Sequence, residues 1–153
     1  DVIASVQATH ATSDMPWVAQ RIGEARTRDG AYLWQALRRS GARLANGSDF
    51  PVEEPNPMLG FYASVTRQDR AGQPPGGWMP DQRLTRAEAL HSFTAGAAYA
   101  AHLEQDLGIL RPGALADLLV LSDDIMQVAP ARILEARPLM TIRGGRVTFR
   151  DGL

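Results

Sequence analysis

Cysteine and lysine are both absent from this chain of 153 residues. Without cysteine, the protein can have no disulfide bond, no zinc site built on thiolates and no cysteine nucleophile. All basic side chains are arginine, which indicates the codon bias of a GC-rich genome. The formal net charge is only −1, so no basic surface is expected that would hold nucleic acid or an anionic membrane.

Several sequence signals of function and targeting are also missing. No apolar run approaches the ~20 residues of a membrane-spanning helix, and no signal peptide opens the chain, so a cytoplasmic location is predicted. A glycine-rich phosphate loop, a GxSxG elbow, an HExxH helix and a His-x-His pair are all absent. The chain starts without Met and inside a β-rich run, so we expect a fragment of a longer protein.

The elements expected from the sequence alternate in type. Two β-rich runs, 2–7 and 42–46, predict buried strands. The stretch between them begins with a predicted loop at 8–17, and Ser13 or Asp14 could cap a helix starting near Pro16. Apolar spacing, glycine stops and a Thr85–Glu88 capping-box pattern predict helices at 17–26, 31–41, 57–69, 84–93 and 95–108.

The carboxyl-terminal third has a different character. It contains a predicted strand in 114–122, a short helical turn in 130–138, and a hairpin in 139–152 that turns at Gly144-Gly145. Strands joined through helices imply a parallel sheet. We therefore expect an α/β fold with two domains, 1–107 and 108–153.

Polar stretches follow both predicted parallel strands. "ATHATSD" follows the first and "GSDFPVEEPNP" follows the second. Because the carboxyl ends of parallel strands meet at one edge of the sheet, where ligands bind in such folds, His10, Asp49 and Asp14 are expected to share a neighbourhood.

Each of these residues also has a structural interpretation. A Ser-Asp pair before Phe-Pro commonly forms an Asx turn or a helix cap, which would occupy the carboxylate of Asp49. His10 could equally be a hydrogen-bonded loop residue. His91 and His102 lie on predicted helices and receive no role.

Three stretches together resemble the carboxyl-terminal part of the amidohydrolase superfamily, and in particular its family 3, the YtcJ-like and N-substituted formamide deformylase-like branch. They are "VIASVQATHATSDMPW", "GARLANGSDFPVEEPNPMLGFYASVTRQD" and "LTRAEALHSFTAGAAYAAHLEQDLGILRPGALADLLVL". The "GSDFP" and "GILRPGALADLLVL" elements are the most specific. One departure is Ala8, which stands where proline is expected before Thr9-His10.

The resemblance implies the carboxyl-terminal fragment of a metal-dependent hydrolase (β/α)8 TIM barrel. Residues 1–107 would form its last strands and helices, and 108–153 would form part of a small composite β-sandwich. It further implies hydrolysis of non-peptide C–N bonds in small amides, formamides or cyclic amides by a metal-activated water, with zinc as the foremost divalent metal. Asp49 would be the metal-binding and catalytic residue, and His10 and Phe50 would contact the substrate.

The resemblance covers only about two of the eight strands of such a barrel. Metal sites of this kind take three or more protein ligands, so the isolated chain is expected to be inactive. One alternative is therefore a catalytically incomplete folding or oligomerisation fragment that needs the missing amino-terminal half of the barrel or associates with itself. Another is a small-ligand binding module with tryptophan-lined loops.

Overall fold

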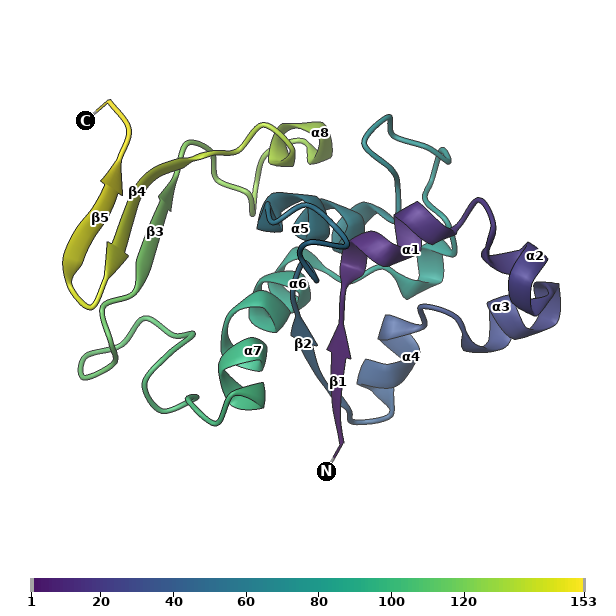
Figure 1. The fold of residues 1–153 in the computed structure, drawn as a ribbon, viewed down its shortest axis with the longest axis horizontal. Helices are drawn as coiled ribbons and strands as arrows, with labels where there is room; N and C mark the ends of the chain where they lie inside the picture. Colours follow the sequence, from purple (N-terminus) through teal and green to yellow (C-terminus); the bar gives the residue numbers. More distant parts are fainter. Residues whose placement is uncertain (1, 153) are drawn as a thin grey trace.

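The computed structural model describes residues 2–152. The described residues form eight α-helices, one 3-10 helix and two sheets. Figure 1 shows the helices grouped around the two-stranded sheet, and the three-stranded sheet near the carboxyl terminus at one side. The elements in chain order are β1 (Ile3–Val6), α1 (Ala8–Asp14), α2 (Val18–Ile22), α3 (Glu24–Gly30), α4 (Trp34–Arg39), β2 (Arg43–Asn46), α5 (Pro57–Thr66), η1 (Pro80–Gln82), α6 (Arg86–Phe93), α7 (Ala95–Ala100), β3 (Leu118–Leu121), α8 (Pro130–Ile133), β4 (Pro138–Arg143) and β5 (Arg146–Arg150).

The two strands of the first sheet run parallel, as the sequence predicts. Ile3 pairs with Arg43 and Val6 pairs with Asn46, so both strands end at the same edge. Four helices connect β1 to β2, and a connection of this kind is what parallel strands require. The sheet therefore brings the segments that follow β1 and β2 next to each other.

The hydrophobic core lies between the first sheet and the helices that pack on it. Val6 and Leu44 of the strands belong to one buried cluster with Phe61 of α5 and Trp34 of α4. Ile133 of α8 is fully buried in the same cluster. The core thus joins the parallel strands to a helix that lies directly before β4.

Helix termini follow the local sequence closely. Thr85 and Glu88 form the expected capping box at the start of α6. Asn56 caps α5 by accepting a hydrogen bond from the Met58 amide, and Pro57 occupies the first turn. These polar residues satisfy amides that the first turn of a helix leaves without partners.

The predicted loop at 8–17 is wrong over most of its length, because residues 8–14 form α1. Ala8 and Ala11 lie three residues apart and are both fully buried, so tertiary packing stabilises a helix that has no strong apolar face of its own. The predicted capping role of Ser13 or Asp14 is also wrong. Both lie inside α1, and the next helix begins only at Val18.

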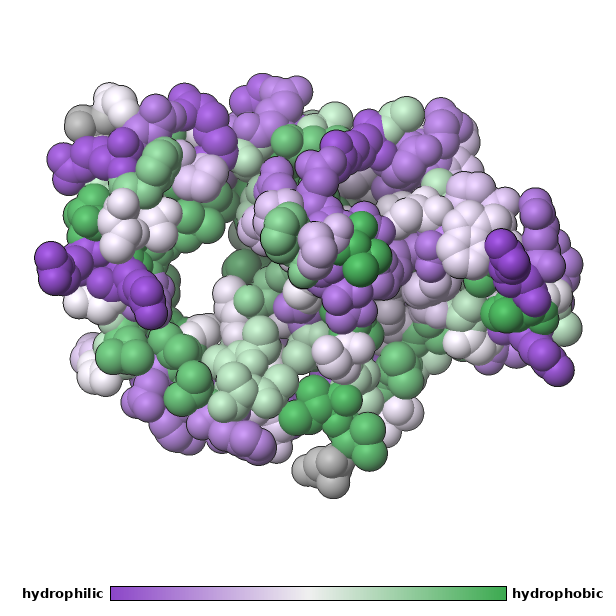
Figure 2. Space-filling view, viewed as in Figure 1, coloured by the Kyte–Doolittle hydropathy of each residue, from purple (hydrophilic) through white to green (hydrophobic). Residues whose placement is uncertain are grey.

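The second sheet is antiparallel, in the order β3-β4-β5. Gly144 and Gly145 both have positive φ and connect β4 to β5, which confirms the predicted hairpin. Large apolar side chains remain exposed on this sheet at Leu119, Val147 and Phe149. Figure 2 shows an opening between this sheet and the helical part of the molecule.

Within residues 2–152, none of the helices combines the length and the apolar character needed to cross a bilayer.

Close packing of α7 on β2 generates a prediction about Gly96. A Cβ atom at this position would lie 2.2 Å from the carbonyl oxygen of Leu44, which belongs to the strand backbone and cannot rotate away. Gly96→Ala is therefore expected to lower the free energy of unfolding by roughly 1–3 kcal/mol, measured by urea denaturation. Gly30→Ala is the matched control, since a Cβ there meets nothing within 4 Å. Equal stability of the two variants would contradict this packing.

Candidate active site

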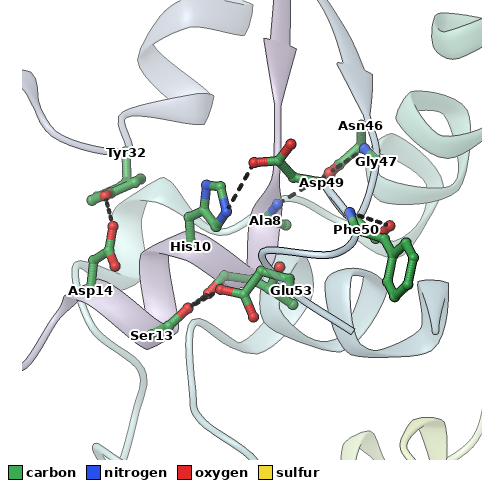
Figure 3. A network of polar contacts seen from close by, with 12 residues as sticks. Ala8, His10, Ser13, Asp14, Tyr32, Asn46, Gly47, Asp49, Phe50 and Glu53 are labelled. Carbon is green, nitrogen blue, oxygen red and sulfur yellow. Dashed lines mark hydrogen bonds and ion pairs between the residues drawn. The ribbon is translucent and has the colours of Figure 1, made fainter. Parts of the chain in front are cut away.

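The candidate active site lies where β1 and β2 end. Val6 ends β1 and α1 begins at Ala8, which places His10 in the middle of that helix. Asn46 ends β2, and the loop that follows carries Asp49. Figure 3 shows the side chains of His10 and Asp49 pointing toward each other from these two segments.

His10 and Asp49 approach to ion-pair distance. The Nε2 atom of His10 lies 3.6 Å from Oδ2 of Asp49, which is too long for a hydrogen bond. Nε2 is buried, and no hydrogen-bond partner for it exists among the described residues. The Asp49 side chain is 48% exposed. The buried Nε2 of His10 and the accessible carboxylate of Asp49 are therefore close neighbours, and neither has its hydrogen-bonding capacity filled by the described residues.

Asp49 does not use its carboxylate in its own turn. Within residues 2–152, its side chain has no hydrogen bond to a neighbouring backbone amide, and the Phe50 amide donates instead to Oγ of Ser48. The backbone carbonyl of Asp49 accepts from the Val52 amide at 2.8 Å. The turn is thus closed by other atoms, and the carboxylate remains available.

The backbone of Asp49 adopts φ 58°, in the left-handed region. Asp tolerates this conformation better than most residues, but it still costs energy relative to glycine. Strained residues persist where the surrounding structure holds them, and they cluster at functional sites. The strain at Asp49 therefore supports a function for this residue beyond forming a turn.

Asn46 links the two segments that carry His10 and Asp49. It is buried at the end of β2, and its Oδ1 accepts from the amides of Ala8 at 3.2 Å and Gly47 at 3.1 Å. Its Nδ2 donates to Oγ of Ser64 on α5 at 3.4 Å. One side chain thus fixes the first residue of α1 against the loop after β2. From the sequence, Asn46 is only the last residue of a predicted strand.

A second contact joins α1 to the loop that carries Asp49. The hydroxyl of Ser13 donates to the Glu53 carboxylate. Glu54 is exposed and pairs with Arg70 on the far side of the loop. Of these two glutamates, Glu53 therefore contacts α1 and Glu54 does not.

Asp14 does not join His10 and Asp49 as expected. Its carboxylate accepts a hydrogen bond from the Tyr32 hydroxyl, and Figure 3 shows this pair on the side of His10 away from Asp49. Burial, followed by the hydrogen bond to Asp14, raises the pKa of Tyr32 to about 12. Tyr32 received no role from the sequence because it lies within the helix predicted at 31–41 and belongs to no motif.

Phe50 is 66% exposed, and its ring lies beyond Asp49 from His10. The predicted contact of Phe50 with a substrate stays a prediction.

The described residues do not complete a metal site. No group of three or more His, Asp or Glu side chains within 2–152 is placed to hold a metal ion. His10 and Asp49 do present one nitrogen and one carboxylate of the kind that divalent metals bind. The donor atoms therefore fit part of a metal site, and the remaining ligands would have to come from elsewhere.

Comparisons with known proteins agree on one family. The sequence profile of the amidohydrolase family matches residues 1–149. The chain is 36% identical over 97% of its length to the protein LONG AFTER FAR-RED 3 of Arabidopsis thaliana, and 30% identical over 97% to the putative amidohydrolase YtcJ of Bacillus subtilis. It is also 31% identical over 75% of its length to the N-substituted formamide deformylase of Arthrobacter pascens.

A solved structure is similar as well. An uncharacterized metal-dependent hydrolase from Pyrococcus horikoshii OT3 superposes with a TM-score of 0.70 and 32% identity over 84% of this chain and 26% of that one. The three curated relatives are matched over 25%, 28% and 21% of their own lengths. This chain thus spans about a quarter of the proteins that it resembles.

The environment of Tyr32 generates a prediction about alkaline pH. Its folded-state pKa of about 12 lies above the ordinary value of 10.0, so folding favours the neutral phenol. The resulting stabilisation is complete below the ordinary pKa and is lost as pH rises from there through the folded-state value. The contribution of Tyr32 is obtained by subtracting the phenolate absorbance of Tyr32→Phe from that of the unmodified protein. We expect this difference to rise near pH 12. A difference curve that rises at the ordinary tyrosine pKa would contradict the burial of this hydroxyl.

Proposed function

This chain belongs to the amidohydrolase family, and we propose that it supplies the Asp49-bearing part of a metal-dependent hydrolase that cleaves non-peptide C–N bonds. The single observation that carries this proposal is the meeting of the Asp49 carboxylate with the buried Nε2 of His10, at 3.6 Å, where two parallel strands end. Ligands bind at this edge in parallel α/β folds.

The proposed architecture is the end of a (β/α)8 barrel, with β1 and β2 as its last two strands. Residues 1–107 would complete the barrel, and 108–153 would form part of a composite β-sandwich. Two features support this. The sheet of β1 and β2 has only two strands, which is small for a structure of independent stability. The chain also spans about a quarter of its relatives.

Small amides, formamides or cyclic amides are the proposed substrates. The N-substituted formamide deformylase is one relative of the chain, and a metal-dependent hydrolase is a structural neighbour. A divalent metal, with zinc foremost, would be held by Asp49 together with ligands from outside the described residues. When bound, such a metal lowers the pKa of a water molecule towards ~7.

Proton transfer is the proposed task of Asp49. Its Oδ2 accepts a proton as water attacks the amide carbonyl and then delivers that proton to the departing nitrogen. The Nε2 atom of His10 lies 3.6 Å from Oδ2 of Asp49 and has no hydrogen-bond partner among the described residues. We assign His10 a contact with the substrate. Phe50 offers an exposed ring beside the same carboxylate for an apolar substituent of the substrate.

The proton-transfer role predicts the behaviour of Asp49→Asn, which keeps the shape of the side chain but cannot carry the proton. In a longer, zinc-loaded protein that supplies the proposed remaining part of the barrel, kcat for an N-substituted formamide should fall ~10²- to 10⁴-fold. Glu54→Gln is the matched control, because Glu54 belongs to the same loop but is exposed and faces Arg70. An Asp49→Asn enzyme as active as its parent would remove Asp49 from the mechanism.

A second candidate function is that of a catalytically incomplete fragment for folding or oligomerisation. It is favoured by the lack of three metal ligands grouped within 2–152, and by the apolar side chains left exposed on the β3–β5 sheet. Such surfaces favour association with the missing part of the barrel or with a second copy.

Metal analysis of the isolated chain tests the second candidate function. The incomplete donor set predicts zinc far below one ion per chain after dialysis, together with a mass in solution above that of a monomer. Stoichiometric, tightly bound zinc in the chain alone would instead show that it builds a complete site, and the fragment interpretation would be abandoned.

A further inference from the structure

Two bulky residues with left-handed backbone, Tyr32 and Arg67, contact each other in the helical part of the molecule. Five residues other than glycine have positive φ within the described part of the chain, and the group consists of Tyr32, Asp49, Arg67, Met79 and His102. Positive φ is an outlier for bulky residues such as Tyr and Arg. Such outliers persist where the surrounding structure stabilises them, and they cluster at functional sites. Tyr32 and Arg67 are joined by a hydrogen bond from the guanidinium to the Tyr32 carbonyl oxygen.

Arg67 is fully buried, and none of the carboxylates in residues 2–152 forms an ion pair with it. Its Nε donates to the carbonyl oxygen of Trp78 at 2.9 Å, and its Nη1 donates to that of Tyr32 at 3.0 Å. The guanidinium also lies 4.5 Å from the ring centroid of Trp34 and 5.0 Å from that of Trp78. Burial lowers its pKa to about 10. Burying a cation carries a desolvation penalty. We interpret the buried Arg67 as the group that holds the backbone carbonyls of Trp78 and Tyr32 in place.

Tyr32 connects this buried arginine to α1. Its carbonyl oxygen accepts from Arg67 and also from the Trp34 amide at 3.1 Å, which fixes its left-handed backbone at φ 53°. Its hydroxyl donates to the carboxylate of Asp14, the last residue of α1. The backbone of Tyr32 is thus anchored in the core, while its hydroxyl holds the end of a helix.

The helix α1 depends on such anchors. It has only seven residues, and no side chain caps its N-terminus at Gln7. Asn46 holds its first residue, Ala8, and Tyr32 holds its last. His10 lies four residues before Asp14, and so on the same face of the helix. A helix of this length held at both ends presents His10 in one orientation.

We propose that Tyr32 is a positioning residue that keeps His10 facing Asp49, by holding the carboxyl-terminal end of α1 through Asp14 while Arg67 holds its own carbonyl. This inference rests on the proposed function only in taking the His10–Asp49 pair as the site. Tyr32 itself need not touch a substrate.

Histidine ring resonances provide a test that needs no activity. The chain has three histidines, so His91 and His102 serve as internal references for His10. Asp49→Asn should displace the ring signal of His10, because a charge 3.6 Å away is removed. In a Tyr32→Phe background, Asp49→Asn should displace the His10 signal by about half as much or less, because His10 and Asp49 are then no longer held close together. An undiminished displacement would overturn the proposal.

Variants on the other side of the bond give an independent reading. Asp14→Asn retains an oxygen that accepts from the Tyr32 hydroxyl and should leave the His10 signal near its original place. Asp14→Ala should displace the His10 signal by the same amount as Tyr32→Phe. Combining the two substitutions should displace it no further, because both remove the same hydrogen bond. Tyr99→Phe is the matched control, since Tyr99 lies on α7 and packs over Arg43. A His10 signal unmoved by Asp14→Ala would equally reject the proposal.

Kinetics separate this inference from the proposed function. In the longer, zinc-loaded protein, Tyr32→Phe should lower kcat about 10- to 100-fold with a small change in KM, as misplacement of a reacting group does. If the parent protein hydrolyses no amide, the proposed function fails, while the resonance test still decides the positioning role. If the parent is active and Tyr32→Phe matches it in kcat, only the positioning role is rejected.

Discussion

The carboxamide of Asn46 is the contact on which the site depends. Parallel pairing brings the ends of β1 and β2 to one edge of the sheet. Pairing alone leaves the positions of the segments that follow the two strands free to vary. Asn46 removes that freedom by accepting from Ala8 at the start of α1 and from Gly47 in the loop that leads to Asp49. Because this amide is buried, an unpaired donor there would carry the full desolvation cost. The same interaction therefore stabilises the core and sets the distance between His10 and Asp49.

Several local features around this contact are unfavourable when taken alone. Asp49 and Tyr32 have left-handed backbones. Among the residues that the structure describes, the buried Arg67 has no carboxylate in an ion pair with it, and the buried Nε2 of His10 has no hydrogen-bond partner. A chain selected for stability alone would replace such groups. They are linked to one another through the His10–Asp49 pair and the Tyr32–Asp14 and Arg67–Tyr32 hydrogen bonds, which is typical of a site whose geometry is maintained for function.

Short-range sequence signals predicted much of the fold. The capping box at Thr85, the Gly144-Gly145 turn and both parallel strands depend on neighbours within a few residues, and the structure confirms them. The helix α1 was missed because Ala8 and Ala11 become buried only when α5 packs against them. Its formation is decided by tertiary contact, which outweighs weak local propensity.

By itself, the sequence determined the family, the alternation of strands and helices, and the prediction that His10 and Asp49 would meet at the ends of two strands. These follow from the order of the motifs and from the direction of parallel strands, both of which can be inferred from the linear sequence. Only the tertiary structure decided that Asp14 turns to Tyr32, that Asn46 ties α1 to β2, and that Arg67 is enclosed by two tryptophans. The physical reason is that these contacts join residues 11 to 38 positions apart in sequence, and a local sequence pattern does not show which distant residues become neighbours.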